Sequence, residues 1–319
     1  MLYKQLLIRV LDNTIVTVFD FQMIADKSKK IAIVTGATGG IGTQLCKSLT
    51  ESEYYVLALC RNSKNGTQNR IPGVEYISGS LDNYGTTGSF VGKIINTLQG
   101  RTIEILFNNA GIIAPHFRLN ENGIESSLFV NSVAPVIITQ QLLPYFTPRN
   151  GRVVNTLSCT IDEMTAKRRI GSFDFDKIVR NSEENQIMGV FKDMTDSLGL
   201  NRKEGFVSLK NYSMTKRLLA FYTSYLLKSY LHDSKMPIAL GADPGVVNTG
   251  IITQHRWYDP LADIFFRPFI KSPSKGSIPL LRAAMTAVDM GSAEYRKVCS
   301  MANPLIIFKG KDKTCTKEL

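Results

Sequence analysis

The chain has 319 residues, of which 44% are hydrophobic and 20% charged, a composition typical of a folded globular protein. Basic residues exceed acidic ones by 11, but they are scattered along the chain, so we expect no nucleic-acid partner. Five cysteines without a CxxC pair and only three histidines disfavour a disulfide framework and a histidine-rich zinc site. We therefore expect reduced thiols, an intracellular protein and no metal.

Residues 1–29 form an N-terminal extension that is apolar but interrupted by charges. Arg9, Asp12 and Asp20 break the apolar stretch, so we do not expect it to span a bilayer. It also lacks the small-residue cleavage site of a secretory signal. Two interpretations stay open: an amphipathic helix that lies on a membrane surface, or a strand or helix packed on the domain.

Residues 30–290 alternate short apolar strands with helical patterns. The predicted strands are IAIVT, YYVLALC, VEYIS, IEILFN, GRVVNTLS and MPIALGA. This alternation predicts one α/β domain, a doubly wound parallel sheet with helices on both faces. The uncharged run Ser126–Pro148 is long enough to raise the question of a membrane span, but its Asn, Gln and Pro residues favour a buried core helix.

The segment IAIVTGATGGIG, residues 31–42, leads from a strand into a cluster of glycines. Gly36 permits a tight turn, Gly40 lets the backbone approach a phosphate, and Gly42 lets helix and strand pack closely. The helix that begins near Ile41 directs free N–H groups and its positive dipole end at an anion. The pattern predicts a pyrophosphate site, although a plain strand-to-helix turn can carry the same glycines.

Tyr212 and Lys216 are four residues apart in YSMTK, so a helix places them on one face. An ammonium beside a phenol favours the phenolate, which predicts a Tyr212 pKa lowered from about 10 and proton exchange near neutral pH. Taken without other motifs, such a pair is more often a solvated helix face. Ser158, at the end of VVNTLS, would hydrogen-bond a substrate oxygen or else serve as a turn or cap residue.

Six motifs stand in the order typical of the short-chain dehydrogenase/reductase family. They are TGATGGIG at 35–42, NNAG at 108–111, Asn131 in FVNSVAP, Ser158, YSMTK at 212–216 and DPGVVNT at 243–249. Residues 30–290 thus resemble this family, and LALCRN, SFDFDK and PGVVNTG are most similar to its retinol-dehydrogenase-like reductases. The resemblance implies a Rossmann-like fold and hydride transfer between a nicotinamide cofactor and a carbonyl or alcohol.

The resemblance also implies residue roles. Tyr212 is the general acid/base, Lys216 additionally holds the nicotinamide ribose, and Asn131 supports a water-linked proton relay or, alternatively, satisfies buried backbone. Arg61 stands where an NAD enzyme would place an acid, which predicts NADP(H) unless Arg61 is merely solvated. The expected cofactor site comprises Gly36, Thr38, Gly40, Ile41, Gly42, Arg61, Asn62, Asn109, Ala110, Gly111, Tyr212, Lys216, Pro244, Gly245, Val247 and Thr249.

Two segments depart from the family pattern. In SGSLDN, Ser80 takes the place of a frequent Asp, and Asp82 is a doubtful substitute, so an adenine contact is expected to be altered. Ser158 and Tyr212 lie 54 positions apart, which predicts an insertion near 161–208 beside the substrate mouth.

The segment HRWYDPLADIFFRPFIK, residues 255–271, interleaves aromatic and basic residues. It predicts an apolar, lipid-like substrate and peripheral contact with a membrane or lipid droplet, or else a core or homodimer contact. The expected location is the cytoplasm or the cytoplasmic face of the endoplasmic reticulum or lipid droplet, and residues 291–319 read as a basic tail. The alternative function is a catalytically weak, nucleotide-binding regulatory or membrane-associated protein on the same fold.

Overall fold

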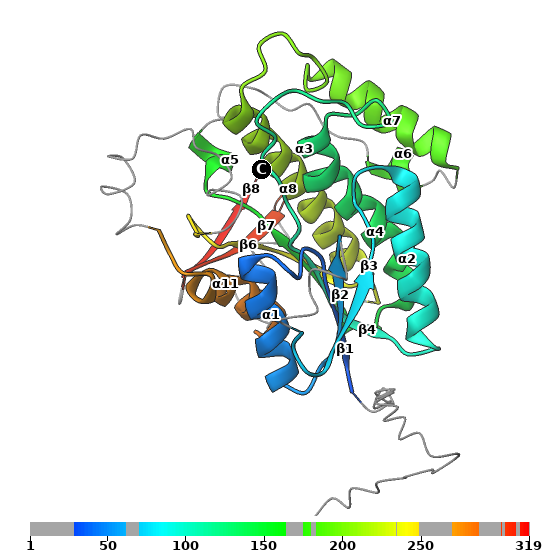
Figure 1. The fold of residues 1–319 in the computed structure, drawn as a ribbon, viewed down its shortest axis with the longest axis vertical. Helices are drawn as coiled ribbons and strands as arrows, with labels where there is room; N and C mark the ends of the chain where they lie inside the picture. The colour runs from blue at the N-terminus through cyan, green and yellow to red at the C-terminus, as the bar shows by residue number, and fades with distance from the viewer. Residues whose placement is uncertain are drawn as a thin grey trace, which may run out of the picture.

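The computed structural model describes residues 29–61, 70–163, 175–179, 183–233, 235–248, 270–286, 301, 304–310 and 313–318. Within them, eight strands form one sheet in the order β3-β2-β1-β4-β5-β6-β7-β8 (Figure 1). All neighbouring strands run parallel except β7 and β8, which are antiparallel. The strands are β1 (Ile31–Val34), β2 (Tyr55–Cys60), β3 (Val74–Ser78), β4 (Ile103–Asn108), β5 (Arg152–Thr156), β6 (Ile238–Asp243), β7 (Pro304–Lys309) and β8 (Lys313–Glu318).

The central strands are mostly apolar, as suits a sheet that is covered on both faces. Every residue of β1, β2 and β6 is buried, as expected for parallel strands between two layers of helices. The strand order reverses between β1 and β4, and ligands of open α/β sheets bind beyond the carboxyl ends of strands at such a point. The predicted doubly wound parallel sheet is confirmed.

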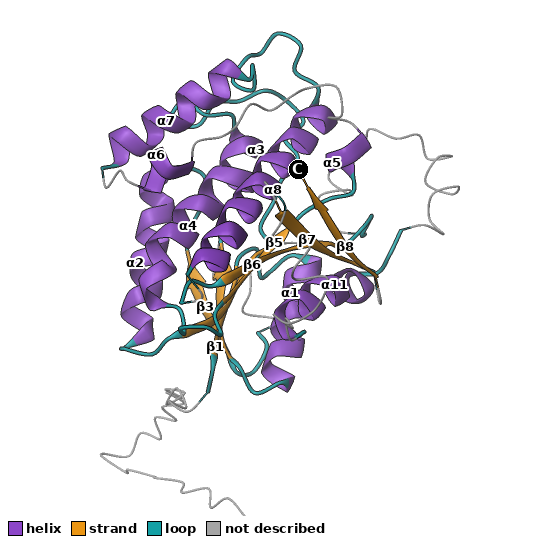
Figure 2. Cartoon of the chain, turned by 180° about the vertical axis from the view of Figure 1, so that it is seen from behind, coloured by secondary structure: helices purple, strands orange, loops and turns teal. Residues whose placement is uncertain are grey.

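Helices cover both faces of the sheet (Figure 2). The helices α1 (Gly40–Glu51) and α11 (Pro273–Met285) contribute Leu45, Leu49 and Leu280 to one apolar cluster. On the other face lie α2 (Tyr84–Leu98), α4 (Ala134–Leu142) and α8 (Ser208–His232), whose apolar residues form the larger cluster.

The uncharged run beginning at Ser126 forms a helix that changes its winding along its length. It starts as α3 (Ser126–Leu128), continues as a π-helix (Phe129–Val133) and α4, and ends in a 3-10 turn (Leu143–Tyr145). By length and composition Ser126–Tyr145 could cross a membrane, but 83% of its most apolar window is buried inside the fold. The prediction of a buried core helix is confirmed.

The long interval between Ser158 and Tyr212 contains α5 (Thr160–Glu163), α6 (Phe175–Val179) and α7 (Glu184–Ser197). The helix α7 buries Met188, Phe191 and Thr195. Its half-buried residues Ile187, Val190 and Met194 pack against the larger apolar cluster. The inserted segment therefore contains a peripheral helix that packs on the domain.

The structure differs from the sequence prediction at the C-terminal end, where a basic tail was expected over 291–319. Strands β7 and β8 extend the sheet, and β7 pairs with β6. The apolar residues Leu305, Ile306, Ile307 and Phe308 are buried. Their burial outweighs the basic character of the flanking residues, so the segment belongs to the domain.

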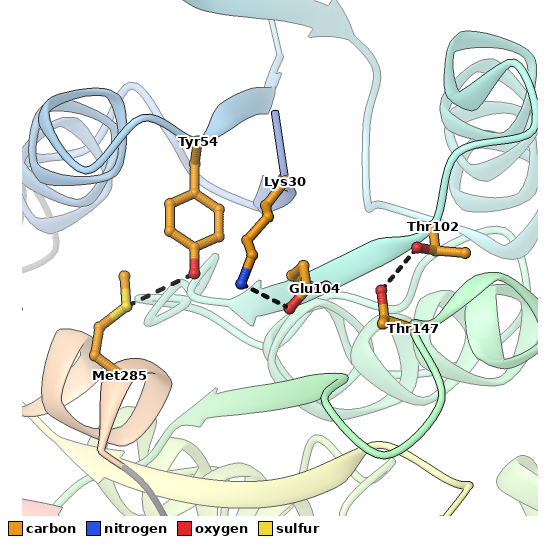
Figure 3. Close-up of polar contacts among 6 residues, drawn as sticks. All are labelled: Lys30, Tyr54, Thr102, Glu104, Thr147 and Met285. Carbon is orange, nitrogen blue, oxygen red and sulfur yellow. Dashed lines mark hydrogen bonds and ion pairs between the residues drawn. The ribbon is translucent and has the colours of Figure 1, made fainter. Parts of the chain in front are cut away.

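Several contacts fasten the edge of the sheet at which the strands begin (Figure 3). Lys30 Nζ lies 3.9 Å from Glu104 Oε2, and the hydroxyls of Thr102 and Thr147 are 2.7 Å apart. Because this edge is opposite the carboxyl ends of the strands, its residues supply control positions remote from a ligand site.

Candidate active site

The turn after β1 needs glycine because other backbone approaches it closely. Gly36 has φ +65°, and a Cβ atom there would lie 2.9 Å from Ala110 Cα. A Cβ atom on Gly42 would collide with the carbonyl oxygen of Gly36. The predicted roles of these two glycines, a tight turn and close packing of helix on loop, are confirmed.

The glycine turn leaves the start of α1 open to an anion. Gly39 is the N-cap residue and offers no side-chain cap, and α1 begins at Gly40. The first N–H groups of a helix have no partner within the helix. Thr38 is exposed and Ile41 half-buried, so the backbone here is accessible. The uncapped first turn fits the pyrophosphate predicted from the sequence.

Thr35 fixes the NNAG turn against the glycine turn. The backbone N–H groups of Asn109 and Ala110 both donate to Thr35 Oγ1 at 3.0 Å. Asn109 Nδ2 donates to the Thr35 carbonyl at 3.0 Å. The two motifs, which lie far apart in the sequence, therefore form one wall at the carboxyl ends of β1 and β4.

Tyr212 and Lys216 lie in the first turns of α8, on the side that meets β5. A hydrogen bond joins the side chains of Tyr212 and Ser158. Lys216 Nζ lies 5.7 Å from the centroid of the Tyr212 ring and donates to the Thr156 carbonyl at 2.8 Å. A Cβ atom on Gly111 would be 3.5 Å from Lys216 Nζ, so the NNAG turn borders the same space. Three of the four predicted catalytic residues thus come together.

The electrostatics of this cluster contradict the predicted lowering of the Tyr212 pKa. Lys216 is 2% exposed, and burial lowers its pKa to about 8. Burial raises the pKa of Tyr212, and the nearby Asp243 and Cys159 raise it further, while the Ser158 hydrogen bond acts in the opposite direction. Part of the tyrosine ring remains accessible, but the hydroxyl lies in a buried environment. The prediction was wrong because it counted the ammonium and not the burial.

Asn131, the fourth predicted catalytic residue, lies in the π-helix. Its Oδ1 accepts from Ile112 N–H at 2.8 Å, and its Nδ2 donates to the Ile112 carbonyl at 2.8 Å and to Thr215 Oγ1 at 3.0 Å. Pro135 has no N–H to bond the Asn131 carbonyl, which accounts for the local change of winding. Asn131 thereby fixes the chain after NNAG to the catalytic helix, the structural role that the sequence left open.

The turn after β6 closes the site from the other side. Gly245 N–H donates to Asp243 Oδ1 at 2.9 Å, and Val247 is buried. A Cβ atom on Gly276 of α11 would lie 2.6 Å from Val247 Cγ2 and 3.4 Å from Ile41 Cγ1. Val247 and Ile41, both predicted to line the cofactor site, therefore meet at one position of α11.

Comparison with known proteins finds similarity to short-chain dehydrogenases. A family model described as short chain dehydrogenase matches residues 30–167. The short chain dehydrogenase yanD of Aspergillus niger is 24% identical over 241 residues, 71% of this chain and 68% of that protein. The chain is thus similar to short-chain dehydrogenases, most directly over residues 30–167.

Solved structures share the fold of this chain. A 3-alpha-hydroxysteroid dehydrogenase from Pseudomonas sp., complexed with NADH, has a TM-score of 0.57 at 15% identity and covers 81% of this chain and 90% of its own. An NADPH-bound carbonyl reductase from chicken fatty liver has a TM-score of 0.55 at 16% identity and covers 88% and 96%.

The part of the candidate site where an adenosine was predicted to bind is described only in part. Arg61 is exposed and directly follows β2. Ser80 donates a hydrogen bond to Asp82 just beyond β3, which lies beside β2. The predicted cofactor contacts Asn62 and Thr249, and nearly all of the aromatic segment 255–271, lie outside the described residues.

The sequence analysis missed a buried carboxylate, Glu125, that joins three elements of the fold. Glu125 is 0% exposed, caps α3 by accepting from Ser127 and Leu128 N–H, and accepts from Asn211 Nδ2 at 2.7 Å. Its own N–H donates to Asn201 Oδ1 at 3.0 Å, beyond α7. Asn211 precedes Tyr212, so this network holds the first turn of the catalytic helix. A glutamate directly before a helical apolar run was the available signal.

Proposed function

We propose that the chain is an NADP(H)-dependent oxidoreductase that interconverts a carbonyl and an alcohol, with Tyr212 as the general acid/base. One observation supports this above all: Tyr212 is hydrogen-bonded to Ser158, with the Lys216 ammonium near its ring, beside the open first turn of α1 and the NNAG turn. Proton donor, oxygen-binding hydroxyl and anion site then lie together at the carboxyl ends of the strands. The similarity to retinol-dehydrogenase-like reductases is part of this proposal.

The residues of this site fit a bound dinucleotide. The glycine turn and the uncapped N-terminus of α1 would hold the pyrophosphate, and Lys216, next to Gly111, would approach the nicotinamide ribose. Arg61, exposed at the end of β2, suits a 2′-phosphate, which favours NADP(H). The bound reduced nicotinamide would supply the hydride.

Tyr212 and Ser158 then act on the substrate oxygen. Tyr212 donates its proton to the oxygen of a carbonyl, and it requires the protonated phenol for this step. Its raised pKa keeps it in that form. Thr160 Oγ1 donates to Ser158 Oγ at 3.1 Å, so the Ser158 proton is available for Tyr212 or for the substrate oxygen.

The substrate in this proposal is apolar beyond its reacting group. Val246 is 49% exposed in the turn after Gly245, and Ile112 and Ile113, which follow NNAG, are half-buried. Apolar side chains beside convergent polar groups are typical of sites for small organic ligands. The predicted lipid-like character is a further step of the same proposal.

The test is a screen of aldehydes, ketones and alcohols with each nicotinamide cofactor, read by the absorbance of the reduced nicotinamide. We expect turnover with an apolar carbonyl and NADPH. Tyr212→Phe should abolish turnover, since it removes the proton donor, and leave the cofactor Kd nearly unchanged because the ring is kept.

Tyr225→Phe is the matched control on the same helix. Its hydroxyl donates to Asp176 at 2.9 Å, away from the candidate site, so turnover should persist. Normal turnover in Tyr212→Phe would refute the assigned acid. Cofactor binding without turnover on any compound would instead favour the regulatory alternative.

A further inference from the structure

Asp243 is a buried acid for which the reaction described above has no role. It ends β6 and is 6% exposed. Oδ1 accepts one hydrogen bond, from Gly245 N–H at 2.9 Å, and the described part of the chain offers the carboxylate no ion pair. A buried carboxylate without a cation is costly, so its presence in the site needs a physical explanation.

The sheet places Asp243 beside the reacting groups. Ala242 pairs with Thr156 of β5, and Leu157 N–H donates to the Ala242 carbonyl at 2.8 Å. Asp243 directly follows Ala242 in β6, so it lies beside Leu157 and one position from Ser158. Lys216 Nζ bonds the Thr156 carbonyl within the same cluster. The carboxylate acts on Tyr212 and is the largest cause, after burial, of its raised pKa.

Other charged and titratable groups also face Asp243. Lys216 approaches from α8, and Cys159 follows β5. Lys309 is the partner of Asp243 in the register of β7. Lys271 Nζ donates to the Pro244 carbonyl at 3.3 Å, and a Cβ atom on Gly245 would lie 2.7 Å from it. Among the described residues, none of these three ammonium groups forms an ion pair with Asp243.

We propose that the negative charge of Asp243 holds the Tyr212 hydroxyl in its protonated form, so that Tyr212 is a proton donor throughout the neutral range and alcohol oxidation begins only at higher pH. Asp243 is thereby a positioning residue that acts through Tyr212. This inference rests on the function proposed above.

The proton balance gives the direction of the effect. In reduction, the Tyr212 O–H bond breaks, its proton goes to the carbonyl oxygen, and the phenolate regains a proton from solvent. A bound reduced nicotinamide would supply the hydride that the carbonyl carbon receives. In oxidation, the phenolate must take the alcohol proton. A negative charge nearby disfavours the phenolate. The oxidation rate therefore begins to rise, and the reduction rate begins to fall, at a higher pH than it would without that charge.

The experiment compares Asp243→Asn with the wild type over a range of pH in both directions. Asparagine keeps an oxygen for Gly245 N–H but carries no charge. We expect both profiles to move to lower pH by about one unit, which is about a tenfold change in the phenolate fraction at a fixed pH. The cofactor Kd should not change. Asp243→Ala removes the hydrogen-bond acceptor for Gly245 N–H as well as the charge. Comparing it with Asp243→Asn therefore distinguishes the effect of the turn from the effect of the charge.

Glu104→Gln is the matched control, because Glu104 is a partly buried acid of the same sheet at its opposite edge (Figure 3). Its profiles should match the wild type. Unchanged profiles in Asp243→Asn, or a shift to higher pH, would overturn the inference and show that Asp243 only holds the turn.

A measurement without substrate separates this inference from the proposed function. NMR of protein labelled at tyrosine Cζ reports the titration of Tyr212, identified by the signal that Tyr212→Phe removes. We expect phenolate to appear at lower pH in Asp243→Asn. If this shift occurs but no compound is turned over, the proposed function is refuted and the role of Asp243 stands. If turnover occurs but the shift does not, the role of Asp243 is refuted.

Discussion

At Tyr212, burial and two neighbouring groups act on the pKa in the same direction. Burial and the charges of Asp243 and Cys159 favour the phenol, and only the Ser158 hydrogen bond favours the phenolate. The protein without cofactor therefore presents Tyr212 as an acid. That state matches carbonyl reduction, in which the first demand on Tyr212 is a proton.

Arg61 carries the prediction about cofactor choice. Its guanidinium is exposed after β2, where it can pair with a 2′-phosphate through charge-assisted hydrogen bonds. Arg61→Ala should raise the KM for NADPH by about tenfold or more, the loss of a hydrogen bond to a charged group, and leave the KM for NADH almost unchanged. Steady-state kinetics with both cofactors measure this.

Arg202→Ala is the control for Arg61, because Arg202 is also exposed but lies in the inserted segment. Equal effects of Arg61→Ala on the two cofactors would show that Arg61 is only a solvated side chain.

The positions of the reacting residues could be predicted from the sequence, and their electrostatics could not. Tyr212 and Lys216 follow from helical spacing, since four residues make one turn. The raised pKa of Tyr212 depends on Asp243, which reaches the site through strand pairing between β5 and β6. Local spacing contains no information about such a neighbour, and none about the burial that dominates the shift.

Among the elements, Glu125 connects α3, the inserted segment and α8. Its carboxylate satisfies two N–H groups of α3 and the Asn211 amide of α8. Asn201, bonded to the Glu125 N–H, also donates to Thr195 of α7 at 2.8 Å. A fully bonded buried network of this kind fixes elements relative to one another. The inserted helix thereby supports the turn that carries Tyr212.

Glu125→Ala tests this connection through stability. It removes a helix cap and leaves the Asn211 amide unsatisfied in the interior, so we expect a loss of about 2 to 4 kcal/mol in the free energy of unfolding. Denaturant unfolding followed by circular dichroism measures it. Turnover should fall more than the cofactor affinity, because the displaced residue is Tyr212.

The matched control for Glu125 is another N-cap. Asn83 caps α2 near the surface, accepting from Thr86 N–H at 2.8 Å, and Asn83→Ala should cost only about 1 kcal/mol. Equal losses in the two variants would mean that Glu125 is an ordinary cap and not a link to α8.

Elements with many apolar residues in a regular pattern were predictable from the sequence, and elements with only a few apolar residues were not. The strands β1 and β2 are continuous apolar runs, and β4 is apolar except for Glu104 and Asn108, so the sequence located all three. The helix α7 buries a stripe of only three residues in a polar segment, which gives weak periodicity. The strand β7 is apolar but short and lies within a basic region, so the sequence suggested a tail.

For the molecule as a whole, stability rests on the two apolar clusters that cover the faces of the sheet. One cluster contains Phe90, Leu106 and Tyr222. The other contains Phe107, Leu45 and Leu280. Burial of apolar area on this scale is the main favourable term in folding. Lys216 departs from this apolar pattern, because it places an ammonium group in the interior. The free-energy cost of burying that charge should appear in the pH dependence of stability.

Lys216→Met tests that cost. The pKa of Lys216 is about 8 in the folded protein, against 10.5 for an ordinary lysine. Between these values the unfolded chain holds a proton that the folded protein has lost, so the wild type gains stability relative to the Met variant as pH rises. The gain should be about 1 kcal/mol per pH unit, and it should be absent below the folded pKa.

We expect the free energy of unfolding of Lys216→Met minus that of the wild type, from denaturant titrations, to fall steadily from pH 8 to 9.5. The shifted Tyr212 does not interfere, since an unfolded tyrosine ionises only near pH 10. The control Thr147→Val, at the opposite edge of the sheet (Figure 3), removes a hydroxyl without altering any charge, so its difference from the wild type should be constant over the same range. A constant difference for Lys216→Met as well would show that the lysine keeps an ordinary pKa despite its burial.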